Sequence, residues 1–208
     1  MQSITTSLMT FTAAASLLTI TPGLDTALVL RTAATEGSRR AALAGLGIVA
    51  GCLAWAAVVA AGLGVLLEAS QLAYTVLRWV GAAYLVWVGY RLLRHPRTTF
   101  ATGVPELRAG RGAFVRGALT NLLNPKVGIF YVSFLPQFVP DNVPVVPYTM
   151  LLGALHALLG AVWFACLIGA TRPLTRVMRR GSVIQFLDRA TGGIFIAFGV
   201  ALAAESRR

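Results

Sequence analysis

Thr21-Pro22-Gly23-Leu24-Asp25 and Asn124-Pro125-Lys126 each interrupt a long apolar run with a proline and a charged residue. A proline inside a helix removes one backbone donor and frees the carbonyl four residues earlier. A charge inside an apolar span is costly, and it persists where it faces protein or a wet cavity rather than lipid. Two such breaks, one in each half of the chain, predict a polar site between inverted halves, an arrangement typical of transporters.

The composition is that of a membrane protein rather than a soluble domain. Of the 208 residues, 57% are hydrophobic and only 12% are charged, whereas about a quarter of the residues in soluble domains are charged. Several apolar stretches exceed the roughly 20 residues with which a helix crosses a bilayer. We expect an all-α, polytopic membrane protein with six transmembrane helices, of which the first and fourth are broken: Ile4–Thr35, Ala41–Leu67, Gln71–Arg91, Ala113–Val139, Val145–Thr171 and Val183–Ala204.

The net charge of +11 indicates membrane orientation rather than affinity for nucleic acid. The basic residues gather in short clusters between apolar runs, and no aromatic-interleaved basic surface accompanies them. With six spans, 13 of the 18 Lys and Arg residues fall in the connections on one side. The positive-inside rule makes that side cytoplasmic. We therefore predict a multi-pass protein of the bacterial inner membrane with both termini outside, and no nucleic-acid partner.

An odd number of spans in each half requires the second half to be inverted. We divide the chain into a first three-helix repeat (1–93), a cytoplasmic linker (94–112) that contains prolines and glycines, and a second three-helix repeat (113–208). Arg78-Trp79-Val80-Gly81-Ala82-Ala83-Tyr84-Leu85 resembles Arg189-Ala190-Thr191-Gly192-Gly193-Ile194-Phe195-Ile196. Pro22 in the first span matches Pro125 in the fourth. These traces of repetition favour two inverted repeats.

Asp25 and Lys126 lie just past the two prolines, far from either expected membrane interface. We interpret Asp25 as a proton carrier or a partner for an ammonium group, and Lys126 as a partner for a carboxylate or a gating residue. The alternative is a static ion pair between them that fixes the helix register. Asn124 and the freed backbone near Thr21 and Gly23 complete the predicted site for substrate or ion.

Three further polar side chains have less certain roles in the predicted spans. His156 is a candidate proton relay, since its pKa moves easily across neutral pH, and a hydrogen-bonded packing histidine is equally expected. Cys52 and Cys166 lie in different apolar runs without metal-ligand spacing, so we expect packing residues and no metal site. The sequence has no enzyme motif and no nucleotide-binding loop. We therefore expect no enzyme activity and no cofactor, and uphill transport would draw on an ion gradient.

Three blocks of the sequence form one recognisable pattern: Thr21–Asp25 followed by Gly47 and Gly51, then Arg78–Leu85, and finally Asn121–Lys126 followed by Phe134–Phe138. These blocks resemble the LysE/RhtB superfamily of bacterial amino-acid exporters, and the resemblance covers nearly the whole chain. In that family a second proline usually stands where this chain has Leu24, and a lysine often stands where it has Arg78. The resemblance implies export of amino acids or related zwitterions by proton antiport.

Our hypothesis is a secondary active amino-acid exporter that works by proton antiport and alternating access. The only intramembrane acids in the sequence are Asp25 and Asp188, which mildly favours neutral or hydroxylated amino acids over dibasic ones. Two alternatives stay open: an exporter of metal ions or other small solutes on the same scaffold, and a membrane thiol-redox carrier that uses Cys52 and Cys166. The expected partners are a small zwitterionic substrate, protons and the lipid bilayer, and a homo-oligomer stays open.

Overall fold

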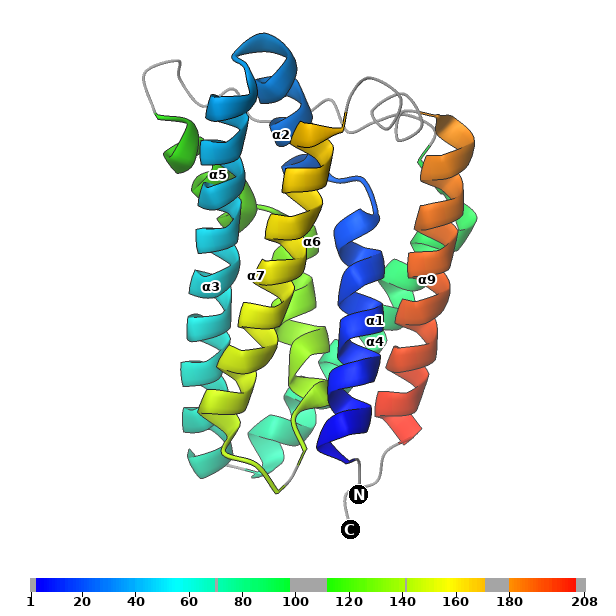
Figure 1. The fold of residues 1–208 in the computed structure, drawn as a ribbon. Coiled ribbons are helices and arrows are strands. Elements are labelled where there is room, and N and C mark those ends of the chain that lie inside the picture. Colours follow the sequence, from blue (N-terminus) through cyan, green and yellow to red (C-terminus); the bar gives the residue numbers. More distant parts are fainter. Residues whose placement is uncertain (1–2, 70, 98–111, 141, 171–179, 205–208) are drawn as a thin grey trace.

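The computed structural model describes residues 3–69, 71–97, 112–140, 142–170 and 180–204, and all regular structure among them is helical. The helices run up and down one elongated bundle, and α1 begins at the end of the bundle where α9 finishes (Figure 1). The all-α prediction is confirmed for these residues. The elements in chain order are α1 (Ile4–Ile20), α2 (Leu24–Thr35), α3 (Ser38–Ala69), α4 (Gln71–Arg94), α5 (Ala113–Leu122), α6 (Pro125–Ile129), η1 (Phe130–Phe134), η2 (Leu135–Phe138), α7 (Val145–Gly169) and α9 (Gly181–Ala204).

Two of these helices, α3 and α7, are long and apolar enough to cross a membrane. The pair α1 and α2 makes a third candidate when the bent pair is counted as one span. The predicted limits of the second, third, fifth and sixth spans agree with α3, α4, α7 and α9 to within about three residues. Most of the predicted linker, from residue 98 to 111, lies outside the described residues.

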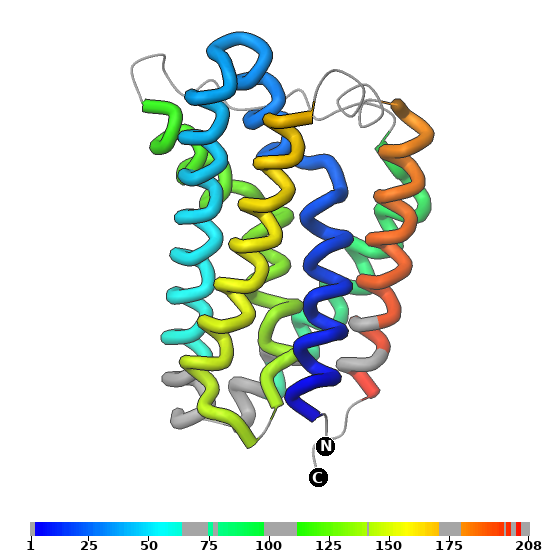
Figure 2. The backbone as a smooth tube through the Cα atoms, in the orientation of Figure 1, coloured from blue at the N-terminus to red at the C-terminus, as the bar shows by residue number. Residues whose placement is uncertain are grey.

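The first predicted break lies between α1 and α2. α1 ends at Ile20, α2 begins at Leu24, and the two axes differ by 49°. Figure 2 shows the chain stepping sideways at this point before it continues as α2. Pro22 explains the end of α1, because its ring nitrogen cannot donate to the carbonyl of Leu18.

The fourth predicted span is broken near its middle, and it is irregular beyond the break. α5 ends at Leu122, and α6 begins with Pro125 at its first position, where a missing N–H costs nothing. α6 then passes into the π-helical turn η1 and the 3-10 turn η2. The sequence predicts a single break here and gives no sign of the π-helical turn. Such turns have no distinct hydrophobic period, and they occur frequently at functional sites.

Glycines bring helices of the two halves of the chain close together. α3 packs along both α5 and α7, and α4 packs along α9. A Cβ added to Gly47 on α3 would lie 2.0 Å from the carbonyl oxygen of Phe114, and one added to Gly117 on α5 would lie 2.0 Å from that of Ala44. Only residues without side chains allow this backbone approach, which is typical of membrane helices. Gly47 and Gly117 therefore serve the close packing of α3 and α5.

An aromatic cluster fixes α1 against the irregular end of the fourth predicted span. The ring of Phe11 lies 5.9 Å from that of Phe130 and 5.3 Å from that of Phe138. The hydroxyl of Ser7 donates to the Phe138 carbonyl and accepts from Tyr148 at 2.9 Å. Buried aromatic pairs with satisfied hydroxyls stabilise this part of the bundle. The polar break in each span lies just beyond it.

Candidate functional site

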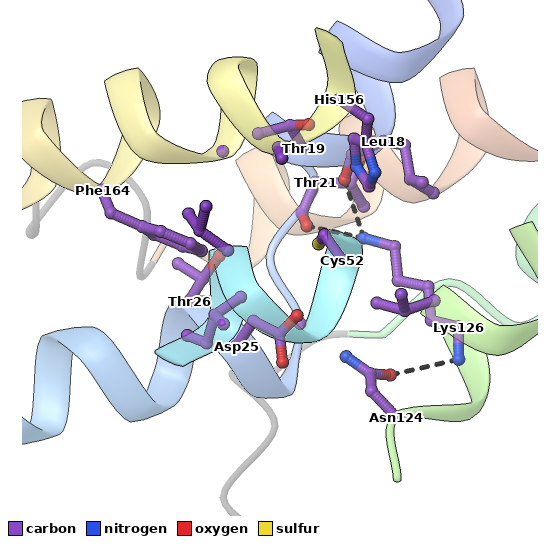
Figure 3. A pocket seen from close by; sticks show the side chains of 16 residues that line it. Leu18, Thr19, Thr21, Asp25, Thr26, Cys52, Asn124, Lys126, His156 and Phe164 are labelled. Atoms are coloured by element: carbon purple, nitrogen blue, oxygen red, sulfur yellow. Dashed lines mark hydrogen bonds between the residues drawn. The ribbon is translucent and has the colours of Figure 1, made fainter. Parts of the chain in front are cut away.

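The two helix breaks face each other across a small cavity, which we call the Asp25 cavity (Figure 3). Its volume is about 50 Å³. Side chains from α1, α2, α3, α6 and α7 contribute to its wall. The structure brings together all the residues that the sequence analysis selected for substrate, ion or proton, and the two prolines lie in the adjacent breaks: Thr21, Gly23, Asp25, Asn124, Lys126 and His156.

Lys126, from the second break, closes the end of α1 at the first break. Its ammonium group donates to the carbonyl of Leu18 at 2.9 Å and to the carbonyl of Thr21 at 2.8 Å (Figure 3). Leu18 carries the very carbonyl that Pro22 leaves without a backbone donor. An ammonium at a helix C-terminus also suits the partial negative charge there. One side chain thus ties the two halves of the chain together at the broken backbone.

Asp25 lies in the first turn of α2, where a carboxylate suits the positive end of the helix. The side-chain amide of Asn121 on α5 donates to its Oδ2 atom at 2.8 Å. Its other oxygen, Oδ1, is buried and has no hydrogen-bond partner within the described structure. In the part of the chain that is described, the salt bridges lie elsewhere, so Asp25 and Lys126 each bind neutral groups rather than one another.

Asn124 serves the second break and the Asp25 cavity at once. Its side-chain oxygen accepts from the backbone N–H of Lys126 at 3.1 Å, which caps the start of α6. Figure 3 shows its amide nitrogen turned toward the Asp25 carboxylate. The side chain is buried, only 4% exposed. A single asparagine therefore stabilises the local helix start and adds an amide donor beside the acid.

His156 and Cys52 complete the wall of the Asp25 cavity on α7 and α3. Nδ1 of His156 lies 3.0 Å from the hydroxyl of Tyr131, and its ring lies 4.9 Å from that of Phe130. It is both a packed aromatic ring and a hydrogen-bonded one, so the proton-relay role stays a prediction. The two cysteines are free, and they lie in different environments because Cys52 is buried whereas Cys166 is exposed.

A second and larger cavity, which the sequence analysis did not predict, lies on the other side of Thr21 and Lys126. We call it the α4–α9 cavity, and its volume is about 230 Å³. The hydroxyls of Thr21 and Thr191 lie 2.8 Å apart at its edge. Its apolar wall comes from α4, α6 and α9. Besides Thr21, Lys126 and Thr191, its lining includes Val88, Leu92, Arg97, Ile129, Asp188 and Phe195.

Arg97 and Asp188 form an ion pair at the α4–α9 cavity. Nη2 of Arg97 lies 2.5 Å from Oδ1 of Asp188, and Oδ2 accepts from Nε at 2.9 Å and from the backbone N–H at 3.0 Å. Asp188 is fully buried, whereas the Arg97 side chain is 36% exposed. The sequence marked Asp188 as an intramembrane acid without giving it a site. Arg97 belongs to the predicted linker, where no periodic pattern points to a partner.

Comparisons with known proteins identify the family of the chain. The family model described as LysE type translocator matches residues 16–206. The threonine efflux protein of Escherichia coli (strain K12) is 32% identical over 88% of this chain and 90% of its own length. The homoserine/homoserine lactone efflux protein of Salmonella typhi is 26% identical over 91% and 92%, respectively.

An uncharacterized membrane protein, YrhP, of Bacillus subtilis (strain 168) is 27% identical over 93% of this chain and 97% of its own length. No solved structure matches the chain. The family model covers most of the chain, and the relatives are matched over nearly their full lengths. The protein is therefore a helical membrane protein that belongs to the LysE type translocator family.

Proposed function

We propose that this chain exports small neutral or hydroxylated amino acids across the bacterial inner membrane by proton antiport. The observation that carries the proposal is the meeting of Asp25 and Lys126, one from each helix break, at a single buried cavity. A transporter that couples a zwitterion to a proton needs such a site, reachable from both halves. Two relatives, a threonine efflux protein and a homoserine/homoserine lactone efflux protein, support amino acids as the substrate class.

The proposal includes six spans arranged as two inverted repeats, 1–93 and 113–208, joined by a cytoplasmic linker. Reciprocal packing supports this arrangement: α1 contacts α7 as α5 contacts α3, while α3 pairs with α7 and α4 with α9. The α4–α9 contact is itself reciprocal, because a Cβ on Gly89 would lie 2.5 Å from the carbonyl oxygen of Gly192, and one on Gly192 would lie 2.7 Å from that of Gly89. The charge of the loops favours an orientation with both termini outside.

In this mechanism Asp25 carries the coupling proton and Lys126 responds to the substrate. Asp25 has one bound and one free carboxylate oxygen, so it has room to accept a proton. Lys126 holds α1 through two carbonyls that it would exchange for a substrate carboxylate, with Asn124 beside it. Releasing the end of α1 frees the first half to move against the second. Thr21 and Gly23 form the backbone hinge of that movement, and His156 is the candidate relay.

Proteoliposome efflux tests the proposal. Purified protein is reconstituted with L-threonine, L-homoserine, L-leucine and L-arginine, each with and without a pH gradient. Gradient-driven export of the first two is expected. Asp25→Asn should retain downhill exchange and lose its response to the gradient, whereas Glu36→Gln, outside the spans, should keep it. Uphill export by Asp25→Asn with an unchanged pH response would remove Asp25 from the coupling step.

The two alternative functions are tested in the same liposomes. In the described part of the chain, no group of three or more His, Cys, Asp or Glu side chains is arranged so that it could hold a metal ion, so no observation favours a metal-ion exporter. Efflux of Zn²⁺ or Mn²⁺ without amino-acid efflux would reverse that choice. Replacing Cys52 and Cys166 together with alanine should leave amino-acid export within about twofold, since neither side chain needs a thiolate here. Loss of function would favour the thiol-redox carrier.

A further inference from the structure

The two cavities differ in what they can hold. A water molecule needs about 10–15 Å³ of cavity volume. On the same scale, an amino acid the size of threonine, with about eight non-hydrogen atoms, needs roughly 100 Å³. The Asp25 cavity, at about 50 Å³, therefore has room for a few waters but not for the substrate. The α4–α9 cavity, at about 230 Å³, has room for the substrate.

The larger cavity also has the chemistry of an amino-acid site. Its polar wall carries two cations, Arg97 and Lys126, and one anion, Asp188, so its formal charge is positive. Arg97 uses the edge of its guanidinium that carries Nε and Nη2 to bind Asp188, and it retains N–H donors for a second acceptor. The Lys126 ammonium has three donors, of which the carbonyls of Leu18 and Thr21 occupy two. Both cations therefore retain a donor with which an added carboxylate can make its first contact, before Lys126 exchanges the two carbonyls for that carboxylate.

We propose that the transported amino acid occupies the α4–α9 cavity, with its carboxylate between Arg97 and Lys126, while the Asp25 cavity holds only water and the coupling proton. This assignment rests on the proposed export function and specifies which residues bind the substrate. Asp188 faces the ammonium group of the substrate, and the hydroxyls of Thr21 and Thr191 lie at the edge of the same cavity. Because Lys126 lines both cavities, substrate binding on one side is coupled directly to the Asp25 side.

The apolar part of the α4–α9 cavity lining selects the side chain of the substrate. Val88, Leu92 and Phe195 line it with apolar atoms. A short aliphatic or hydroxylated side chain fits such a wall, whereas a guanidinium or a second ammonium would be buried there without a partner. The cavity therefore favours threonine-sized substrates and rejects dibasic ones, in a region of the bundle that Asp25 does not reach.

Kinetics of efflux test the role of Arg97. Arg97→Gln should raise KM for L-threonine by at least about tenfold, the equivalent of one lost charged contact of about 1.4 kcal/mol, with a smaller change in the maximal rate. Arg94→Gln is the matched control, because Arg94 is exposed on α4 and lies over the Tyr90 ring. Since Arg97→Gln leaves Asp188 buried without its cation, Arg97→Gln with Asp188→Asn is a second variant. An unchanged KM in the double variant overturns the assignment.

Thiol protection locates the substrate directly. Cys52 is a natural probe of the Asp25 cavity. Val88→Cys, combined with Cys52→Ala and Cys166→Ala, gives a near-isosteric probe of the α4–α9 cavity. L-Threonine should slow modification by methyl methanethiosulfonate at position 88, with half-protection near the KM of efflux, and should protect Cys52 less. Equal or greater protection of Cys52, or none at position 88, overturns the assignment while measured export leaves the proposed function standing. Failure of the wild-type protein to export any amino acid rejects the function itself.

Discussion

The two helix breaks are built from the same elements, a proline beside a charge, yet their backbones are satisfied in opposite ways. The second break is closed locally. Asn124 caps α6 with its own side chain, and its backbone N–H donates at 3.0 Å to the carbonyl of Asn121, which Pro125 would otherwise leave free. The first break is closed from a distance, because the Leu18 and Thr21 carbonyls depend on Lys126.

This difference shows which of the two breaks is free to move. A locally capped break keeps its hydrogen bonds whatever the rest of the bundle does. A break whose carbonyls are bound by a donor from the other half loses these hydrogen bonds when the two halves move apart. Each buried carbonyl left unpaired then costs about 1–3 kcal/mol. The first break is therefore the variable element of the pair, and the second is the platform that holds it. Four predictions test this contrast.

The largest effect is expected from removing the Lys126 ammonium, which binds the carbonyls of the first break. Lys126→Met leaves two buried carbonyls unpaired and removes a cation from both cavities, so export should fall by at least about 100-fold, since each lost interaction of 1.4 kcal/mol corresponds to tenfold. Asn124→Ala, which removes a helix cap at the second break, should cost only about 1 kcal/mol of stability. Efflux and thermal unfolding in detergent measure both. Equal losses of stability in the two variants would contradict the contrast.

Replacing the two prolines one at a time should distinguish the two breaks by their effects on the rate of export. Pro22→Ala supplies a backbone N–H that competes with Lys126 for the Leu18 carbonyl, which favours a continuous helix and should slow export by about tenfold, or roughly 1.4 kcal/mol. Pro125→Ala changes the first position of α6, where the N–H is unpaired in any case, and should alter export by less than about threefold. Initial efflux rates decide the order, and a larger effect at Pro125 would reverse our assignment of the moving break.

A smaller effect is expected where α3 supports the Asp25 site. A Cβ on Gly51 would lie 2.6 Å from Oδ1 of Asn121, the residue whose amide binds Asp25. Gly51→Ala should therefore displace that amide, at a cost of about 1–3 kcal/mol for overpacking, and weaken the response of export to a pH gradient. Gly62 is the matched control on the same helix, because a Cβ there meets no atom within 4 Å. Similar behaviour of Gly51→Ala and Gly62→Ala would show that the Asn121 contact is dispensable.

Much of this architecture could be predicted from local chemistry. The missing N–H of Pro22 and the acceptable N1 position of Pro125 explain both breaks without knowledge of the fold. Hydropathy located α3, α4, α7 and α9 to within a few residues, because the length of an apolar run is a property of the chain alone. The residues predicted for the site line one cavity for a related reason, since a polar group inside an apolar span has to face another such group.

What the sequence did not reveal are choices between distant partners. Lys126 binds the carbonyls of α1 rather than the carboxylate of Asp25, and nothing in the spacing of these residues distinguishes the two outcomes. Arg97 reaches Asp188 over 91 positions of sequence from a segment with no periodic pattern. The α4–α9 cavity exists because helices from both halves leave a gap beside their glycine contacts. Such a gap depends on three-dimensional packing, which a single sequence does not display.

The smallest effect is expected where the outer arms of the two broken spans are tied together. Glu36, just after α2, bonds to Arg116 on α5 at 2.7 Å and to Arg40 at 3.1 Å. The hydrogen bond from Arg116, helped by Arg40, lowers the pKa of Glu36 from 4.5 to about 2. A depressed folded-state pKa contributes stability above pH 4.5, and this contribution is lost as the pH falls toward 2.

Because the pair of Glu36 and Arg116 is partly exposed, Glu36→Gln should cost at most about 1 kcal/mol of stability at neutral pH. Thermal unfolding of the wild-type protein and Glu36→Gln between neutral pH and pH 3 should show the difference in stability narrowing as Glu36 of the unfolded chain becomes protonated, whereas Arg40→Gln should lose only part of this stability. A difference in stability that is independent of pH would mean that packing alone joins α2 to α5, and the first break would then move without α2.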